Sequence, residues 1–108
     1  MSTKLSPEQS AIDRLIVDEI FETIPEEWTC FSLIVEPRKL DGGGQIVTLI
    51  NPEVVGAEIE PSTTIRGHVS ELVAFLAKEG RTWERITYQA SLDDSGAWRL
   101  KITAPLPD

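Results

Sequence analysis

Ile24-Pro25-Glu26-Glu27-Trp28 marks the position where a helix must end and a strand begins. Proline cannot continue a helix, so the preceding helical segment is expected to end near Thr23. After the stretch, residues 28–36 change to β-branched and aromatic side chains, which favour a strand. The stretch also adds two carboxylates to the end of a segment that is already acidic.

The residues before this stretch have the period of an amphipathic helix. Ser6-Pro7-Glu8-Gln9 has the form of a helix start, with a capping serine and a proline in the first turn. Apolar side chains then recur at steps of three and four residues, at Ile12, Leu15, Ile16, Ile20 and Ile24. The acidic side chains occupy the remaining circumference, at Asp13, Asp18, Glu19 and Glu22.

The residues after this stretch predict three strands, a second helix and a hairpin. We expect the strands at 28–36, 45–50 and 54–59, with a glycine-containing loop at 37–44 between the first two. The helix is expected to begin after the capping residues Ser62-Thr63-Thr64 and to stop at Gly80. Residues 83–92 and 97–103 alternate apolar and polar side chains around the turn Asp93-Asp94-Ser95-Gly96.

The predicted order α-β-β-β-α-β-β indicates an α+β fold, with an antiparallel sheet of about five strands and two helices on one of its faces. The 108 residues, 41% of them hydrophobic, suffice for one core. We therefore expect a single domain over residues 1–108, with an ordered core at about 6–103. A single cysteine and no long apolar run predict a cytoplasmic protein without a disulfide or a membrane span.

The net charge of −8 is unevenly distributed along the chain. The first 64 residues hold 12 acidic and 4 basic side chains, whereas residues 65–108 hold 6 of each. This excess disfavours nucleic acid, whose binding needs clustered Lys and Arg, and it disfavours anionic membranes for the same reason. A basic protein partner would instead be attracted and its association accelerated.

The sequence offers no set of residues for catalysis. His68 is the only histidine and lies among helical positions without a nucleophile motif, so we interpret it as a structural or surface residue. Cys30 lies between apolar residues of a predicted strand, where a small buried side chain is the expected role. These two residues cannot complete a zinc site, and no calcium-loop spacing is present. We predict that the protein is not an enzyme and has no metal or cofactor.

Two of the three tryptophans and one basic stripe can each be interpreted in two ways. Trp98 falls on the apolar face of the hairpin, whereas Trp28 and Trp83 begin strands and are expected to be structural, with an interface role as the alternative. The outward phase of the hairpin carries Arg85, Thr87, Gln89, Arg99 and Lys101. We interpret that stripe as a solvated sheet face, because the overall charge argues against nucleic acid.

Several motifs resemble those of the YezG-like family. They are Ile24-Pro25-Glu26-Glu27-Trp28, Trp83-Glu84-Arg85-Ile86-Thr87 and the hairpin sequence Gly96-Ala97-Trp98-Arg99. The order of elements is similar from about Ser6 to Thr103. Members of this family are immunity proteins that bind and silence bacterial toxins, often nucleases, and they carry no catalytic motif. One departure is the end of the last strand, where Lys101-Ile102-Thr103-Ala104-Pro105 stands in place of the aromatic and acidic residues typical of the family.

The sequence and the resemblance together predict an immunity protein that neutralises a cognate toxin by tight stoichiometric binding. The partner is expected to be a basic toxin domain. The residues predicted to contact it are Asp13, Asp18, Glu19, Glu22, Glu26 and Glu27. Two alternatives stay open: a small metal- or ligand-binding protein that uses the same acidic cluster, and a structural subunit that self-associates through its sheet.

Overall fold

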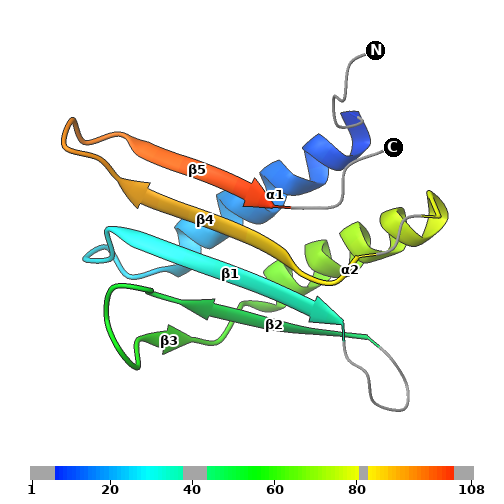
Figure 1. The fold of residues 1–108 in the computed structure, drawn as a ribbon, viewed down its shortest axis with the longest axis horizontal. Helices are drawn as coiled ribbons and strands as arrows, with labels where there is room; N and C mark the ends of the chain where they lie inside the picture. The colour runs from blue at the N-terminus through cyan, green and yellow to red at the C-terminus, as the bar shows by residue number, and fades with distance from the viewer. Residues whose placement is uncertain (1–6, 38–43, 81–82, 104–108) are drawn as a thin grey trace.

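The computed structural model describes residues 7–37, 44–80 and 83–103, and it consists of one sheet with both helices on the same face (Figure 1). The predicted α+β class and the order α-β-β-β-α-β-β are confirmed. The elements are α1 (Pro7–Thr23), β1 (Cys30–Pro37), β2 (Gln45–Ile50), β3 (Glu58–Ile59), α2 (Thr63–Lys78), β4 (Ile86–Leu92) and β5 (Trp98–Thr103). None of the described helices is long and apolar enough to cross a membrane.

The helix α1 ends where the proline requires it to end. The amide of Ile24 donates to the carbonyl of Ile20 at 2.9 Å, which is the last helical bond before Pro25. A turn follows, closed by a 3.1 Å hydrogen bond from the amide of Trp28 to the carbonyl of Pro25. This turn reverses the chain so that β1 can run back beneath the helices.

The five strands form one antiparallel sheet in the order β3-β2-β1-β4-β5, so β1 lies in the middle. Leu33 of β1 stands opposite Leu49 of β2 on one side and Tyr88 of β4 on the other. β4 and β5 pair as the predicted hairpin, with Ala90 opposite Leu100. The turn between them is held by Asp93, whose Oδ1 accepts hydrogen bonds from the amides of Ser95 and Ala97 at 2.9 and 3.0 Å.

Two strands, β1 and β4, begin two and three residues later than predicted. β1 begins at Cys30 rather than at residue 28, because the turn after Pro25 takes in Trp28. β4 begins at Ile86 rather than at residue 83, the position at which the pairing with β1 starts. The loop expected at 37–44 falls largely on residues outside the described part of the chain, as do both predicted tails.

The third predicted strand is much shorter than expected. Only Glu58–Ile59 pairs with β2, because the preceding residues form two successive turns. The amide of Val54 donates to the carbonyl of Asn51, and the amide of Ala57 donates to the carbonyl of Val54. Gly56 has a φ of +82°, a conformation that the strand prediction did not allow for.

The helix α2 begins and ends as its sequence predicts. Ser62 caps the helix, and its hydroxyl accepts a hydrogen bond from the amide of Ile65 at 3.1 Å. Gly80, with a φ of +70°, follows the last turn and lets the chain leave the helix.

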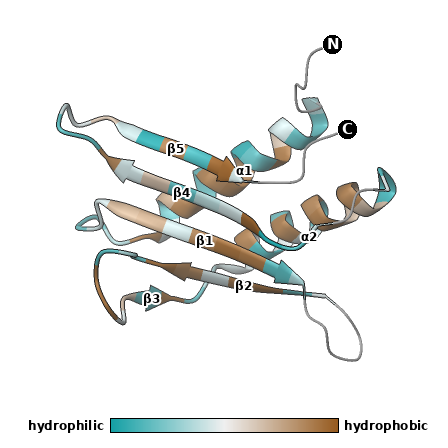
Figure 2. Cartoon of the chain, viewed as in Figure 1, coloured by the Kyte–Doolittle hydropathy of each residue, from teal (hydrophilic) through white to brown (hydrophobic). Residues whose placement is uncertain are grey.

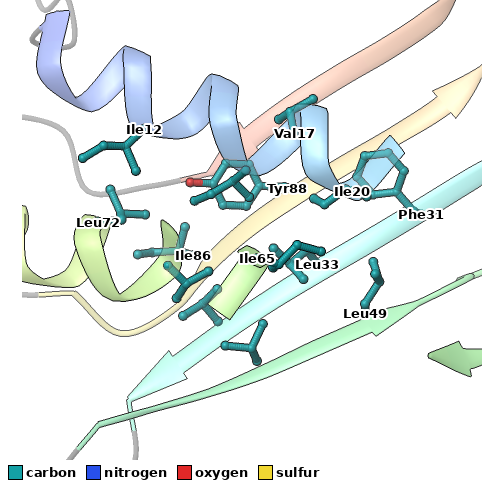
Figure 3. Close-up of a cluster of buried hydrophobic side chains, with 14 of the residues drawn as sticks. Ile12, Val17, Ile20, Phe31, Leu33, Leu49, Ile65, Leu72, Ile86 and Tyr88 are labelled. Atoms are coloured by element: carbon teal, nitrogen blue, oxygen red, sulfur yellow. The ribbon is translucent and has the colours of Figure 1, made fainter. Parts of the chain in front are cut away.

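The core lies between the helices and the sheet (Figure 3). Ile16 and Ile20 of α1 and Leu72 of α2 pack over strand residues that are fully buried, including Leu33 and Tyr88. Figure 2 shows that hydrophobic residues predominate in β1, β2 and α2, whereas β5 carries several hydrophilic ones. The opposite face of the sheet is covered by no described helix (Figure 1).

Candidate functional site

Five of the six acidic residues predicted to bind a partner lie on the surface of α1 and in the turn that follows it. Asp18 and Glu22 are exposed on the helix, and Glu19 beside them is half-buried. Glu26 and Glu27 are exposed in the turn between α1 and β1. We call these five residues, Asp18, Glu19, Glu22, Glu26 and Glu27, the acidic surface.

The carboxylates of the acidic surface have no cationic partner among the described residues. Three acidic residues elsewhere do: Glu36 pairs with Arg85 at 3.1 Å, Glu60 with Arg66 at 3.0 Å and Asp93 with Arg99 at 2.7 Å. The chain thus neutralises several of its carboxylates locally but leaves this group uncompensated. Its negative potential is available to a ligand from outside.

The position of these acids at the end of α1 opposes the helix dipole. A helix carries partial negative charge at its C-terminus, where cations are favourable and carboxylates unfavourable by about 0.3–1 kcal/mol. The last turn of α1 contains no basic residue and includes Glu22, and Glu26 follows directly after the helix. These side chains are therefore expected to reduce the stability of the helix slightly.

Two exposed apolar side chains accompany the acidic surface. Leu15 is 46% exposed and Phe21 is 38% exposed on the same helix. Together with Asp18, Glu19, Glu22 and His68 they line a shallow hollow of about 440 Å³ beside α2. Apolar contacts surrounded by charged groups are the usual composition of a protein interface. Leu15 belongs to the predicted apolar stripe of the helix, but its position lies at the margin of that stripe, where the side chain is exposed.

Asp13 does not belong to this surface, which corrects its assignment as a partner-contacting residue. It is only 3% exposed, because its position on α1 turns towards the sheet. Its Oδ1 accepts a 2.5 Å hydrogen bond from the Tyr88 hydroxyl, and its Oδ2 has no hydrogen-bond partner among the described residues. Burial raises the pKa of the Asp13 carboxyl, and the hydrogen bond from Tyr88 offsets part of that rise.

The other residues considered as possible functional residues, namely Cys30, His68, Trp28 and Trp83, have contacts typical of structural residues. Cys30 is buried, its Sγ lies 3.0 Å from Oδ1 of Asn51, and burial raises the pKa of its thiol. His68 is partly exposed and its Nδ1 lies 3.0 Å from Oε1 of Glu71. Trp28 is part of the buried core, and Trp83 packs against that core while remaining partly exposed.

The described part of the chain contains no preformed metal-binding site. Nowhere in these segments do three His, Cys, Asp or Glu side chains gather closely enough to hold an ion. The acidic surface is accordingly an open array of carboxylates along a helix and a turn.

Comparison with known proteins identifies no family. No protein-family model matches the sequence, and no curated protein matches it significantly.

Proposed function

We propose that this protein binds a basic protein domain through its acidic surface, and that it acts as an immunity protein that neutralises a toxin in this way. The observation that supports the proposal most strongly is the set of uncompensated carboxylates on α1 and the following turn, next to exposed Leu15 and Phe21. The immunity role itself comes from the resemblance of the sequence motifs to those of the YezG-like family.

The arrangement suits the capture of a cationic surface. Clustered carboxylates accelerate the encounter with a basic partner, and they give charge-assisted hydrogen bonds to Lys and Arg at contact. A nuclease toxin presents such cations where it binds phosphates, so a row of carboxylates can occupy the same place. Leu15 and Phe21 would then supply the apolar contact that slows dissociation.

The test is a charge reversal with a matched control elsewhere on the molecule. The binding partner is the basic C-terminal domain of a toxin encoded in the adjacent reading frame, and association is followed by stopped-flow fluorescence. We expect Glu22→Lys/Glu26→Lys/Glu27→Lys to slow association by about tenfold or more at low salt, and to remove most of its salt dependence. We expect Glu84→Lys, an exposed position beyond the far end of β1, to have much less effect.

Stability measurements distinguish this result from misfolding. Because the three glutamates lie at the negative end of α1, their reversal is expected to leave the thermal midpoint unchanged or to raise it. Association that is equally fast in the triple variant and in the unaltered protein would refute the proposal.

A further inference from the structure

The face of the sheet opposite the helices carries a pattern that the proposed function does not use. The strand register places five residues, one from each strand, in a single row across this face: Lys101, Gln89, Ser32, Ile50 and Glu58. A neighbouring row contains Thr103, Thr87, Ile34 and Thr48. We call this surface the open face.

The middle of the open face is more apolar than a solvated sheet requires. Antiparallel sheets usually place polar side chains on the face that contacts water. Here Ile34 of β1 stands opposite Thr48 of β2, with Ile46 and Ile50 two residues away on either side along β2. Such diagonal neighbours are within side-chain reach, so the three isoleucines form one patch. Ile46 is 46% exposed, and the other two are half-buried.

The two edges of the open face carry opposite charge. The β5 edge bears Arg99 and Lys101, and the β3 edge bears Glu58. Among the described residues neither Lys101 nor Glu58 has an ion-pair partner, although they end the same row. Arg99 is already paired with Asp93. On the strands themselves the unpaired charges are one cation at one edge and one anion at the other, with an apolar patch between them, and the exposed Glu53 lies beside the cationic edge.

We propose that a second copy of this chain covers the open face, related by a twofold axis that runs parallel to β1. Because β1 is the middle strand, this rotation places β5 of one copy over β3 of its partner. Lys101 then faces Glu58 twice, once on each side of the axis, and Ile34 lies next to its own copy. The product is a sandwich of two aligned sheets, a common packing for faces of this kind.

The charge pattern selects this axis over the alternative. A twofold axis across the strands would place β5 over β5, so that Lys101 and Arg99 met cations of the partner. Like charges opposite one another are unfavourable, whereas the axis along β1 places Lys101 of each copy opposite Glu58 of its partner.

The available area indicates a reversible dimer. Strands spaced about 4.8 Å apart, with residues rising about 3.3 Å, give the open face about 500 Å² in projection. Stable interfaces bury about 600–1,000 Å² of accessible surface per partner, so this face falls below that range, as weak and reversible contacts do. The acidic surface lies on the helix layer, on the other side of the sheet, and it stays accessible in the dimer.

Sedimentation equilibrium tests this proposal at protein concentrations from about 1 µM to about 1 mM, a range that includes a dissociation constant on the order of micromolar or weaker. We expect a monomer–dimer equilibrium for the unaltered protein and a monomer for Ile34→Asp, which places two carboxylates next to each other on the axis. Glu58→Lys and Lys101→Glu are each expected to weaken the dimer by about fivefold or more, because each places like charges face to face twice. The double variant Glu58→Lys/Lys101→Glu restores opposite charges at both contacts, so we expect it to recover most of the affinity.

Each other outcome overturns the proposal. A protein that stays monomeric at 1 mM has no self-association through this face. A dimer that tolerates Ile34→Asp uses a different surface, and failure of the double variant to recover excludes the axis along β1. Asp18→Lys, on the helix layer, serves as the control and leaves the dimer unchanged, while circular dichroism verifies the fold of every variant. Because the acidic surface is not altered in the test variants, a failure here leaves the proposed function intact.

Discussion

Tyr88→Phe is expected to lower the free energy of unfolding at pH 7 by about 2–4 kcal/mol, although it removes a single oxygen atom. The Tyr88 hydroxyl donates to Oδ1 of Asp13, and Asp13 is almost completely buried. Without that donor, neither oxygen of the carboxyl keeps a hydrogen-bond partner among the described residues. The Asp13 carboxyl must then either stay charged in an apolar layer or bind a proton at a pH at which a free carboxyl is ionised. Both states cost free energy.

The pH dependence identifies the carboxyl as the cause. A group whose pKa is raised in the folded state contributes its full stabilisation of the fold below the pKa that it has in the unfolded state. This stabilisation is lost as the pH rises through the pKa of the folded state. Burial raises the pKa of Asp13, so its ionisation opposes folding at neutral pH. Asp13→Asn removes this titration, and its stability relative to the unaltered protein should increase as the pH rises from about 4 to 7.

Urea denaturation at pH 4 and pH 7 measures both effects. The destabilisation caused by Tyr88→Phe should be larger at pH 7 than at pH 4, and it should shrink when Asp13→Asn is also present. Asp18→Asn, an exposed position on the same helix, is the control and should change stability by less than about 0.5 kcal/mol. A Tyr88→Phe penalty that is equal at both pH values would show that Asp13 does not determine it.

Phe31→Ala is expected to lower the free energy of unfolding by about 3–5 kcal/mol, a large part of the roughly 5–15 kcal/mol that stabilises a typical domain. Phe31 is buried on β1 and makes an edge-to-face contact with Phe21 of α1, with ring centroids 5.4 Å apart. Phe21 in turn contacts Trp98 of β5 in the same manner at 5.0 Å. The ring of Phe31 thus fixes the C-terminal half of α1 to the sheet, the half that carries the acidic surface.

Substitutions at two other positions show whether the loss of stability comes from buried packing or from surface contacts. Phe21→Ala should cost less than Phe31→Ala, because Phe21 is 38% exposed. Val55→Ala, in the fully exposed turn before β3, should be nearly neutral. Urea unfolding of the three variants gives the order. If Phe31→Ala cost no more than Phe21→Ala, the aromatic cluster would not be the attachment of α1.

The elements that the sequence predicts well are those decided by local chemistry. Pro25 ends α1, Ser62 caps α2 and Asp93 organises the last turn through contacts within four residues, so short-range patterns suffice for them. The hairpin β4–β5 follows from its alternation of apolar and polar residues. These features specify the class and the order of elements, whereas the order of strands within the sheet depends on pairings far apart in the sequence.

The burial of Asp13 can be predicted from helix geometry, but its hydrogen-bond partner cannot. With 3.6 residues per turn, Asp13 lies about 60° around the helix from Ile16, whereas Leu15 lies about 100° away. Helix geometry alone therefore places Asp13 nearer to the core than Leu15. Its partner Tyr88 is 75 residues away, and no local pattern connects the two. The short β3 was missed for another reason, because side-chain type at 54–57 suggested a strand while the hydrogen bonds form turns.

Carboxylate footprinting of the protein with and without the basic toxin domain tests the role of the acidic surface most directly. Carbodiimide-activated labelling followed by mass spectrometry reports the accessibility of each Asp and Glu. We expect binding to protect Asp18, Glu22, Glu26 and Glu27 from labelling, and Glu58 and Glu84 to be labelled as in the free protein. Unchanged labelling of α1 and its following turn in a saturated complex would contradict it.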